Sequence, residues 1–191
     1  MRYTDPNSYA DNPGSIKLSP FKLRKIKKMI CMTRREKEYF KKRIPAVREY
    51  VALGDTQPAY VMSVSPLVIS AYSDEMDAVV MLCFPDELAT QYKLSAGDRL
   101  VTVNTYRYLD KNGIAPDIFV GENYLNRYSN CAPIVPLFIS GSTKLMKQKL
   151  SLFDEEQWAM VREKSLEYAS AHPDLMRDGF FYLKAANRIV Y

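Results

Sequence analysis

Glycine and histidine are both scarce in this chain of 191 residues, which has seven glycines and a single histidine, His172. Nucleotide-binding loops of the Walker and GxGxxG types need closely spaced glycines, and neither pattern occurs. Ser–His–Asp and Cys–His catalysis would both have to use His172, whose position before Pro173 is typical of a helix end. The sequence therefore lacks the common glycine-loop nucleotide sites and gives little support to histidine-dependent hydrolysis.

Cysteine is also rare, and Cys31, Cys83 and Cys131 are widely spaced with no CxxC pair. Zinc ribbons and redox dithiols place their cysteines in such pairs, so we expect no metal and no cofactor. No stretch of about 18 apolar residues occurs, so no membrane span is predicted. The first twenty residues lack an apolar core and do not resemble a secretory signal. Unpaired thiols are typical of a reducing compartment, and we expect a cytoplasmic protein.

Apolar residues make up 47% of the chain and charged residues 26%, which is ordinary for a protein with a packed core. The periodicity of the apolar residues predicts an α+β fold, in which N-terminal basic helices pack on a mostly antiparallel sheet and further helices follow. We expect an irregular arm over residues 1–18, a basic helical segment over 19–54, and an α+β core over 55–191 that forms one compact unit with the helices.

Positive charge is concentrated near the N-terminus. Residues 17–50 contain eight lysines and five arginines against three glutamates, a net charge of +10 in a chain whose total is +5. Ser19-Pro20 predicts the start of one helix, and Thr33 with Glu36 forms a capping box that predicts the start of a second. Pro45 either kinks this second helix or begins a new one. Gly54 predicts its end, in a left-handed conformation.

The cations of this segment are the candidate anion-binding residues. They are Lys22, Arg24, Lys25, Lys27, Lys28, Arg34, Arg35, Lys41, Lys42 and Arg43. Three interpretations remain open. The lysines can form a solvated face of helices that pack on the core, a surface for the phosphates of DNA or RNA, or a surface for an acidic protein partner or an anionic membrane.

Alternation and apolar runs predict strands over residues 59–64, 67–72, 78–84 and 99–108, with a helix over 86–93. Asn112-Gly113 predicts a turn that returns the chain as a hairpin, and residues 117–120 predict a short strand. Prolines at both ends of the run beginning at residue 133 indicate an edge strand or an extended segment. Helices are predicted over 143–150 and 155–171, and residues 179–191 predict a terminal hairpin or a second helix.

One segment resembles a known family. Val79–Phe84, Pro85, Leu88, Leu94, Gly97-Asp98 and Leu100–Val103 follow the order strand, proline, short helix, Leu-x-x-Gly-Asp, strand. This order, over residues 79–103 only, resembles the GD box of cradle-loop barrels and looped-hinge DNA-binding proteins. The resemblance implies a turn at the glycine, hydrogen bonds from backbone amides to the aspartate, barrel-like packing and DNA binding. The length of the chain and its many helices depart from that family.

Residues 121–132 are polar and rich in asparagine, as in a long surface loop, and loops of this kind often bind partners. The candidate partner-binding residues are Asn123, Tyr124, Asn126, Arg127 and Tyr128. A plain connection is the competing interpretation. Carboxylates at Asp98, Asp110, Asp117 and Glu122 would support acid–base chemistry if they converged, but Asp at such positions more often bonds locally within turns.

We therefore expect a non-enzymatic binding protein that associates with nucleic acid through its basic N-terminal helices. One alternative is a protein-interaction factor, such as an inhibitor, immunity or assembly protein, which would use the 121–132 loop or its acidic body. A second alternative is a small enzyme that uses the loop carboxylates near Asp98 and Asp117.

Overall fold

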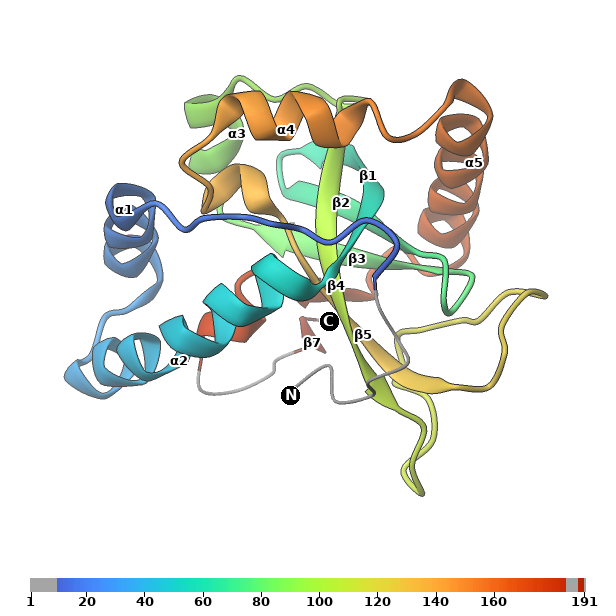
Figure 1. The fold of residues 1–191 in the computed structure, drawn as a ribbon, viewed down its shortest axis with the longest axis horizontal. Helices are drawn as coiled ribbons and strands as arrows, with labels where there is room; N and C mark the ends of the chain where they lie inside the picture. The colour runs from blue at the N-terminus through green and yellow to red at the C-terminus, as the bar shows by residue number, and fades with distance from the viewer. Residues whose placement is uncertain (1–9, 185–188, 191) are drawn as a thin grey trace.

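The computed structural model describes residues 10–184 and 189–190, which contain a seven-stranded sheet with helices on both faces (Figure 1). Along the sheet the strand order is β5-β4-β1-β2-β3-β6-β7. All neighbouring strands are antiparallel except β3 and β6, which are parallel. The predicted α+β class with a mostly antiparallel sheet is confirmed. The bounds of the strands are β1 Asp55–Val64, β2 Leu67–Ser73, β3 Ala78–Phe84, β4 Arg99–Tyr108, β5 Tyr128–Ile134, β6 Met176–Asp178 and β7 Ile189–Val190.

Helix α5 (Glu155–Ala171) covers one face of the sheet by itself, at the right of Figure 1. Its Trp158, Val161 and Tyr168 pack against alternate residues of β1, β2 and β3, such as Tyr60 and Met81. Alternation places these strand residues on one face because successive side chains of a strand point to opposite sides. The result is a small apolar layer between α5 and the sheet.

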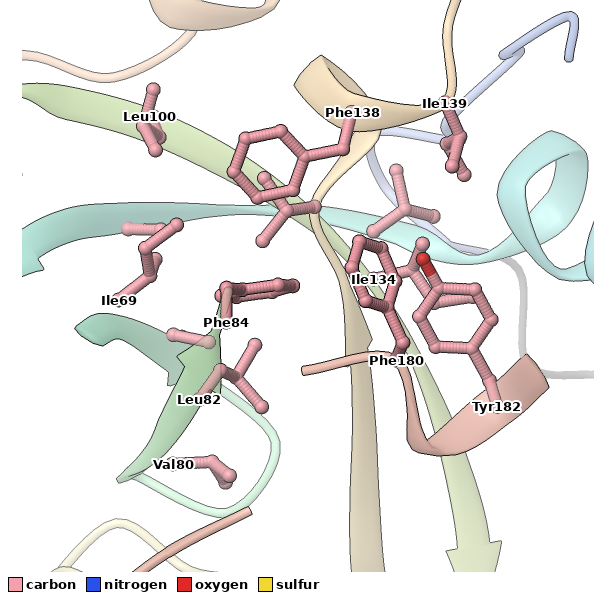
Figure 2. Close-up of a cluster of buried hydrophobic side chains, with 14 of the residues drawn as sticks. Ile69, Val80, Leu82, Phe84, Leu100, Ile134, Phe138, Ile139, Phe180 and Tyr182 are labelled. Carbon is pink, nitrogen blue, oxygen red and sulfur yellow. The ribbon is translucent and has the colours of Figure 1, made fainter. Parts of the chain in front are cut away.

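The larger core lies on the other face, where the alternate strand residues include Ile69, Val80 and Leu82. Figure 2 shows Phe84, Phe138 and Phe180 meeting in this core. Phe84 lies edge-on to both other rings, at centroid distances of 5.0 Å and 5.2 Å. Such edge contacts stabilise aromatic clusters beyond the area that they bury. The helices on this side are α1 (Pro20–Ile30), α2 (Arg34–Leu53), α3 (Glu87–Tyr92) and α4 (Thr143–Leu150).

Helices α1 and α2 begin where their caps predict. The Ser19 hydroxyl accepts the Lys22 amide, and Thr33 and Glu36 form the reciprocal capping box. Helix α2 runs without interruption through Pro45, so the sequence alternative of a new helix at that residue is wrong. The helix is long enough for its apolar contacts to hold it together although Pro45 lacks an amide hydrogen.

Gly54 ends α2 in an extended conformation, with φ of −63°, and the predicted left-handed turn is wrong. The glycine is needed for a different reason. A β-carbon at this position would lie 2.6 Å from the carbonyl oxygens of Asn104 and Tyr50. The chain therefore uses glycine here to bring the end of α2 against β4.

The connection between β4 and β5 differs most from the prediction. Gly113 does turn, with φ of +72°, and β4 and β5 are antiparallel, but the returning strand is β5 and not residues 117–120. Strand β5 also starts inside the predicted 121–132 loop. Its polar residues form a strand because the edge of β4 supplies hydrogen-bond partners for the backbone. Pro133 lies within this edge strand, and the 3₁₀ helix η1 (Pro136–Phe138) follows.

Within the predicted segment 179–191, the described residues contain a 3₁₀ helix and then one short strand, which pairs with a strand that lies before the segment. Strands β6 and β7 are antiparallel, and the 3₁₀ helix η2 (Phe181–Leu183) lies between them. The remainder of the predicted 179–191 hairpin falls partly on residues 185–188 and 191, outside the described residues. At the other end, Ile16 of the predicted arm is buried, and its amide donates to the carbonyl of Val51. The described part of this arm is therefore packed along α2.

In the segment that resembles the GD box, the structure has a turn at Gly97 and one backbone amide bonded to Asp98. Gly97 has φ of +89°, and the Asp98 carboxylate accepts the Ser95 amide at 2.8 Å. The strand that follows, β4, pairs with β1 and β5, while the strand before it, β3, pairs with β2 and β6. A turn of this kind is also common in unrelated proteins, so the geometry describes the segment and does not identify a family.

Candidate functional site

The outer faces of α1 and α2 carry a group of exposed cations, which we call the basic helical surface. On α1, Arg24 and Lys28 are four residues apart on the face opposite the buried Ile26, and the exposed Lys25 lies beside them. Of these cations, Arg34 alone has an ion-pair partner in the described part of the chain, Glu38 at 3.1 Å. The members of the basic helical surface are Arg24, Lys25, Lys28, Arg34, Arg35, Lys41 and Lys42.

The other three predicted cations lie elsewhere or are less exposed. Lys27 is only half exposed. The Lys22 ammonium donates to the Leu137 carbonyl at 2.7 Å and lies 5.0 Å from the Tyr92 ring, and burial lowers its pKa. Lys22 therefore holds α1 against the core. Arg43 points to the opposite side of α2 from Lys41, where its Nε donates to the Tyr182 carbonyl at 3.0 Å.

Arg43 lines a pocket of about 580 Å³, which we call the α2–β4–β5 pocket. Its walls are one side of α2, the second half of β4, the 112–117 turn, the middle of β5, and residues of β6 and η2. The volume is in the range of small-molecule sites. On α2 the lining residues Tyr39, Arg43 and Tyr50 recur at i, i+4 and i+11, so they form one stripe beside the buried stripe of Phe40, Val47 and Val51.

The floor of the pocket contains a buried ion pair. Arg177 and Asp117 are 8% and 2% exposed, and the guanidinium binds both carboxylate oxygens, with Nη2 at 2.7 Å from Oδ1. The third guanidinium nitrogen, Nη1, donates to the Cys131 carbonyl at 2.6 Å, and the Tyr168 hydroxyl donates to the Asp117 carbonyl. These bonds commit Asp117 to Arg177, so the carboxylate is not available as a catalytic base.

Two further arginines leave the pocket with a positive potential. Arg43 and Arg107 each donate Nε to a neutral oxygen, of Tyr182 and of Ser129, at 3.0 Å. Among the described residues, neither guanidinium has a carboxylate within 4.0 Å. Since Asp117 already neutralises Arg177, no carboxylate of the described residues compensates the two remaining positive charges, and they lie in a concave site, where the field is stronger than on a flat surface.

Aromatic rings form much of the rest of the wall, from Tyr39, Tyr50, Tyr106, Phe181 and Tyr182. Tyr182 is 3% exposed, yet its hydroxyl has no hydrogen-bond partner within the described residues. Burial raises the pKa of this hydroxyl, so it stays protonated. The Asn130 Oδ1 atom, on the adjacent wall, is also buried without a partner there. Buried polar groups without partners are rare in proteins, and a bound water, ion or ligand is one way in which the missing bond is supplied.

The predicted partner-binding loop is held to the body of the protein. The Asn123 side chain and amide donate to the buried Asp77 carboxylate, and the Tyr124 hydroxyl donates to the Tyr128 carbonyl at 2.5 Å. Tyr128 is buried in β5 and stacks on Tyr106 at 4.8 Å. Asn126, at φ of +55°, and Arg127 remain exposed. These hydrogen bonds and ring contacts are those of an ordered connection between two strands.

The carboxylates do not converge. Asp98 and Asp110 flank opposite ends of the ten-residue β4, and each accepts a nearby backbone amide, of Ser95 and of Asn112. A strand of that length separates them by about 30 Å. Glu122 is exposed in the loop. Within residues 10–184 and 189–190, no group of three His, Cys, Asp or Glu side chains is arranged to hold a metal ion.

Comparison with protein-family models, with curated proteins and with solved structures finds no match to this chain. In the part of the chain that the structure describes, no helix is both long and apolar enough to cross a membrane. Function is therefore inferred from the geometry of two sites alone, the basic helical surface and the α2–β4–β5 pocket.

Proposed function

We propose that the protein is a non-enzymatic nucleic-acid-binding protein, in which the basic helical surface contacts phosphates. The observation that carries this proposal is that two consecutive helices expose cations of which only Arg34 is ion-paired among the described residues. Phosphate contacts from Lys and Arg supply most of the affinity of sequence-independent binding, and they release counterions as they form. A cytoplasmic location is part of the proposal.

Helix α1 supports this interpretation in particular, because it contains no acidic residue and its solvent-facing side carries Arg24, Lys25 and Lys28. On α2, Glu36 is occupied by the capping box and Glu38 by Arg34, so these carboxylates do not cover the neighbouring lysines. The rest of the chain is acidic overall. The protein would therefore turn its α1 and α2 side toward the phosphate backbone of a nucleic acid.

The test compares two double variants that remove the same charges from different places. One is Arg24→Gln with Lys28→Gln on α1, and the other is Arg162→Gln with Lys111→Gln, both exposed and outside α1 and α2. Binding to a short duplex oligonucleotide is measured by fluorescence anisotropy over a series of salt concentrations. We expect wild-type affinity to fall steeply with salt, and the α1 variant to lose up to about two units of the log–log slope.

The matched control should keep the wild-type slope, because the charges that it removes lie outside α1 and α2, although its net charge equals that of the α1 variant. Equal losses in both variants would show that only the total charge matters, and would contradict a localised surface. A flat salt profile, or no retention of duplex or single-stranded DNA or RNA at low salt, would end the nucleic-acid proposal and leave the protein-partner alternative.

A further inference from the structure

We propose that the α2–β4–β5 pocket is a second, separate site, which binds one nucleotide with its base between the aromatic walls and its phosphate at Arg43 and Arg107. This proposal does not depend on the basic helical surface, because none of the residues that line the pocket belongs to that surface. Both possible sources of this ligand, a free metabolite and the end of a nucleic-acid strand, present the same chemical group, a nucleoside monophosphate.

The charge of the pocket matches one phosphate. Arg43 and Arg107 are the guanidiniums in its wall that have no carboxylate beside them in the described residues, and each is anchored to the protein through Nε, so its terminal nitrogens can face a ligand. A phosphate monoester carries up to two negative charges near neutral pH, so two arginines neutralise it. The planar guanidinium also suits phosphate geometry better than an ammonium does. A triphosphate would exceed this charge.

The aromatic side chains of the pocket wall favour a ligand that contains a flat ring over a bare anion. Tyr39 and Phe181 lie on separate elements, α2 and η2, and Tyr106 lies on the β4 wall. Stacking on such rings is favourable for every base, since each base has a π face. Inorganic phosphate or a phosphosugar would leave this surface unused. A cavity of about 580 Å³ holds a nucleotide but not a larger dinucleotide cofactor in full.

Two lining residues, Tyr182 and Asn130, each have a buried polar atom without a partner among the described residues, and we assign these two atoms to the edge of a base. The Tyr182 hydroxyl can donate, and the Asn130 Oδ1 atom can accept. Together they match a group that presents one acceptor and one donor, as the edges of the nucleic-acid bases do. Among the described lining residues the one carboxylate is that of Asp117, and Arg177 binds both of its oxygens, so it does not repel the phosphate.

Isothermal titration calorimetry with AMP, GMP, CMP and UMP tests the site, with adenosine and inorganic phosphate as the two partial ligands. We expect at least one mononucleotide to bind, and each partial ligand to bind about tenfold more weakly or worse, because each lacks one half of the contacts. Calorimetry is preferred to tryptophan fluorescence, since the only tryptophan, Trp158, packs under α5 beside Arg99, at the other end of β4.

Three single variants locate the binding. Arg107→Gln removes one phosphate contact and should weaken mononucleotide affinity by about tenfold or more. Tyr182→Phe removes only the unpartnered hydroxyl, so it should weaken affinity severalfold while leaving the melting temperature equal or higher. If Tyr182 had only a structural role, its substitution would not weaken mononucleotide binding while leaving the melting temperature equal or higher. Arg162→Gln, on α5 and outside the pocket, removes the same charge as Arg107→Gln, so it is the matched control and should bind like wild type.

The outcomes separate this proposal from the preceding one. Mononucleotide binding that persists in the Arg24→Gln/Lys28→Gln variant, but falls in Arg107→Gln, supports a separate pocket even if duplex binding fails. Displacement of the mononucleotide by a single-stranded oligonucleotide would identify a strand end as the source, and no displacement would identify the free nucleotide. No mononucleotide binding at millimolar concentration, or binding that all three variants leave unchanged, would overturn the pocket proposal without bearing on the basic helical surface.

Discussion

Buried ionisable side chains show at the residue scale where the fold depends on single contacts. Arg177 reaches from β6 to Asp117 in the β4–β5 connection, across 60 residues of sequence. A buried charge is tolerated only when it is paired and fully hydrogen-bonded, and this arginine meets both conditions through Asp117 and the Cys131 carbonyl. Loss of one partner leaves the other charge without compensation.

We therefore expect Asp117→Ala to lower the free energy of unfolding by about 3–5 kcal/mol, since Arg177 would remain buried and unpaired. Asp110→Ala, at an exposed position in the same connection, should cost less than about 1 kcal/mol. Urea denaturation followed by circular dichroism measures both. Similar losses in the two variants would mean that Arg177 finds other partners.

Asp55 is buried at the start of β1, and its carboxylate accepts the side chain of Gln57 and the amide of Asn12. Burial outweighs these bonds and raises the pKa of Asp55 from 3.8 to about 6. Because the pKa is higher in the folded chain, the folded state keeps a proton that the unfolded state releases between these two values. Stability from this group is therefore lost as the pH rises through that window.

Asp55→Asn should consequently be more stable than wild type at pH 8, by at most about 3 kcal/mol, because the amide carries no charge to desolvate. Below pH 4 the two proteins should have nearly equal stability. Urea unfolding at a series of pH values measures the difference, and a gain that does not change with pH would show that the charge of Asp55 is not its cause.

At the scale of the element, α2 combines three roles on three sides. Phe40, Val47 and Val51 are buried, Tyr39 and Tyr50 face the pocket with Arg43, and the basic cations face solvent. The start of this helix and its buried stripe are predictable from the sequence, because capping and periodicity are local signals. The stripe of Tyr39, Arg43 and Tyr50 is also visible at helical spacing, but only the tertiary structure shows what it faces.

Pro45 is the weak point of this helix, because it cannot donate to the Lys41 carbonyl. Its position is exposed, so alanine fits there without steric change. We expect Pro45→Ala to stabilise the protein by about 1–3 kcal/mol, through the restored hydrogen bond and the higher helix propensity of alanine. Glu49→Ala, one turn later on the same exposed side, should have little effect in the same thermal melt. A destabilised Pro45→Ala protein would contradict this account.

Prediction of the elements succeeded where patterns were strong and local. The apolar run at residues 78–84 and the alternation at 99–108 gave the bounds of β3 and β4, and the caps at Ser142 and Asp154 gave α4 and α5. It failed over residues 121–132, because β5 forms only through its pairing with the edge of β4. Polar composition hides such a strand, since strand formation depends on the cross-strand neighbours that tertiary structure supplies.

At the scale of the whole molecule, the sheet divides a single helix on one face from the other helices on the opposite face (Figure 1). The uneven charge along the sequence is readable from composition, but the pocket is not. Its lining residues extend from Tyr39 to Tyr182, and no sequence pattern shows that such distant segments meet. Arg43, which the sequence places among the anion-binding cations, lines this pocket, and only the tertiary structure shows that position.

Chemical labelling of lysine would test the orientation that this charge distribution implies. With a duplex oligonucleotide present at low salt, acetylation of Lys25, Lys28, Lys41 and Lys42 should decrease, while Lys111 and Lys147, outside α1 and α2, should react as in the free protein. Mass spectrometry of the digested protein reads each site. Uniform protection of all these lysines would mean that the oligonucleotide has no preferred side.

The α2–β4–β5 pocket exists only in the folded chain, because of the number of elements that build it. Helix α2, strands β4, β5 and β6, and η2 must all be in place before the cavity forms. Any small molecule that enters it binds the native state alone, and by mass action a hundredfold excess over its dissociation constant adds about 2.7 kcal/mol to the free energy of unfolding. Heat resistance in the presence of candidate metabolites is thus a direct way to find the natural occupant, whatever role that molecule has.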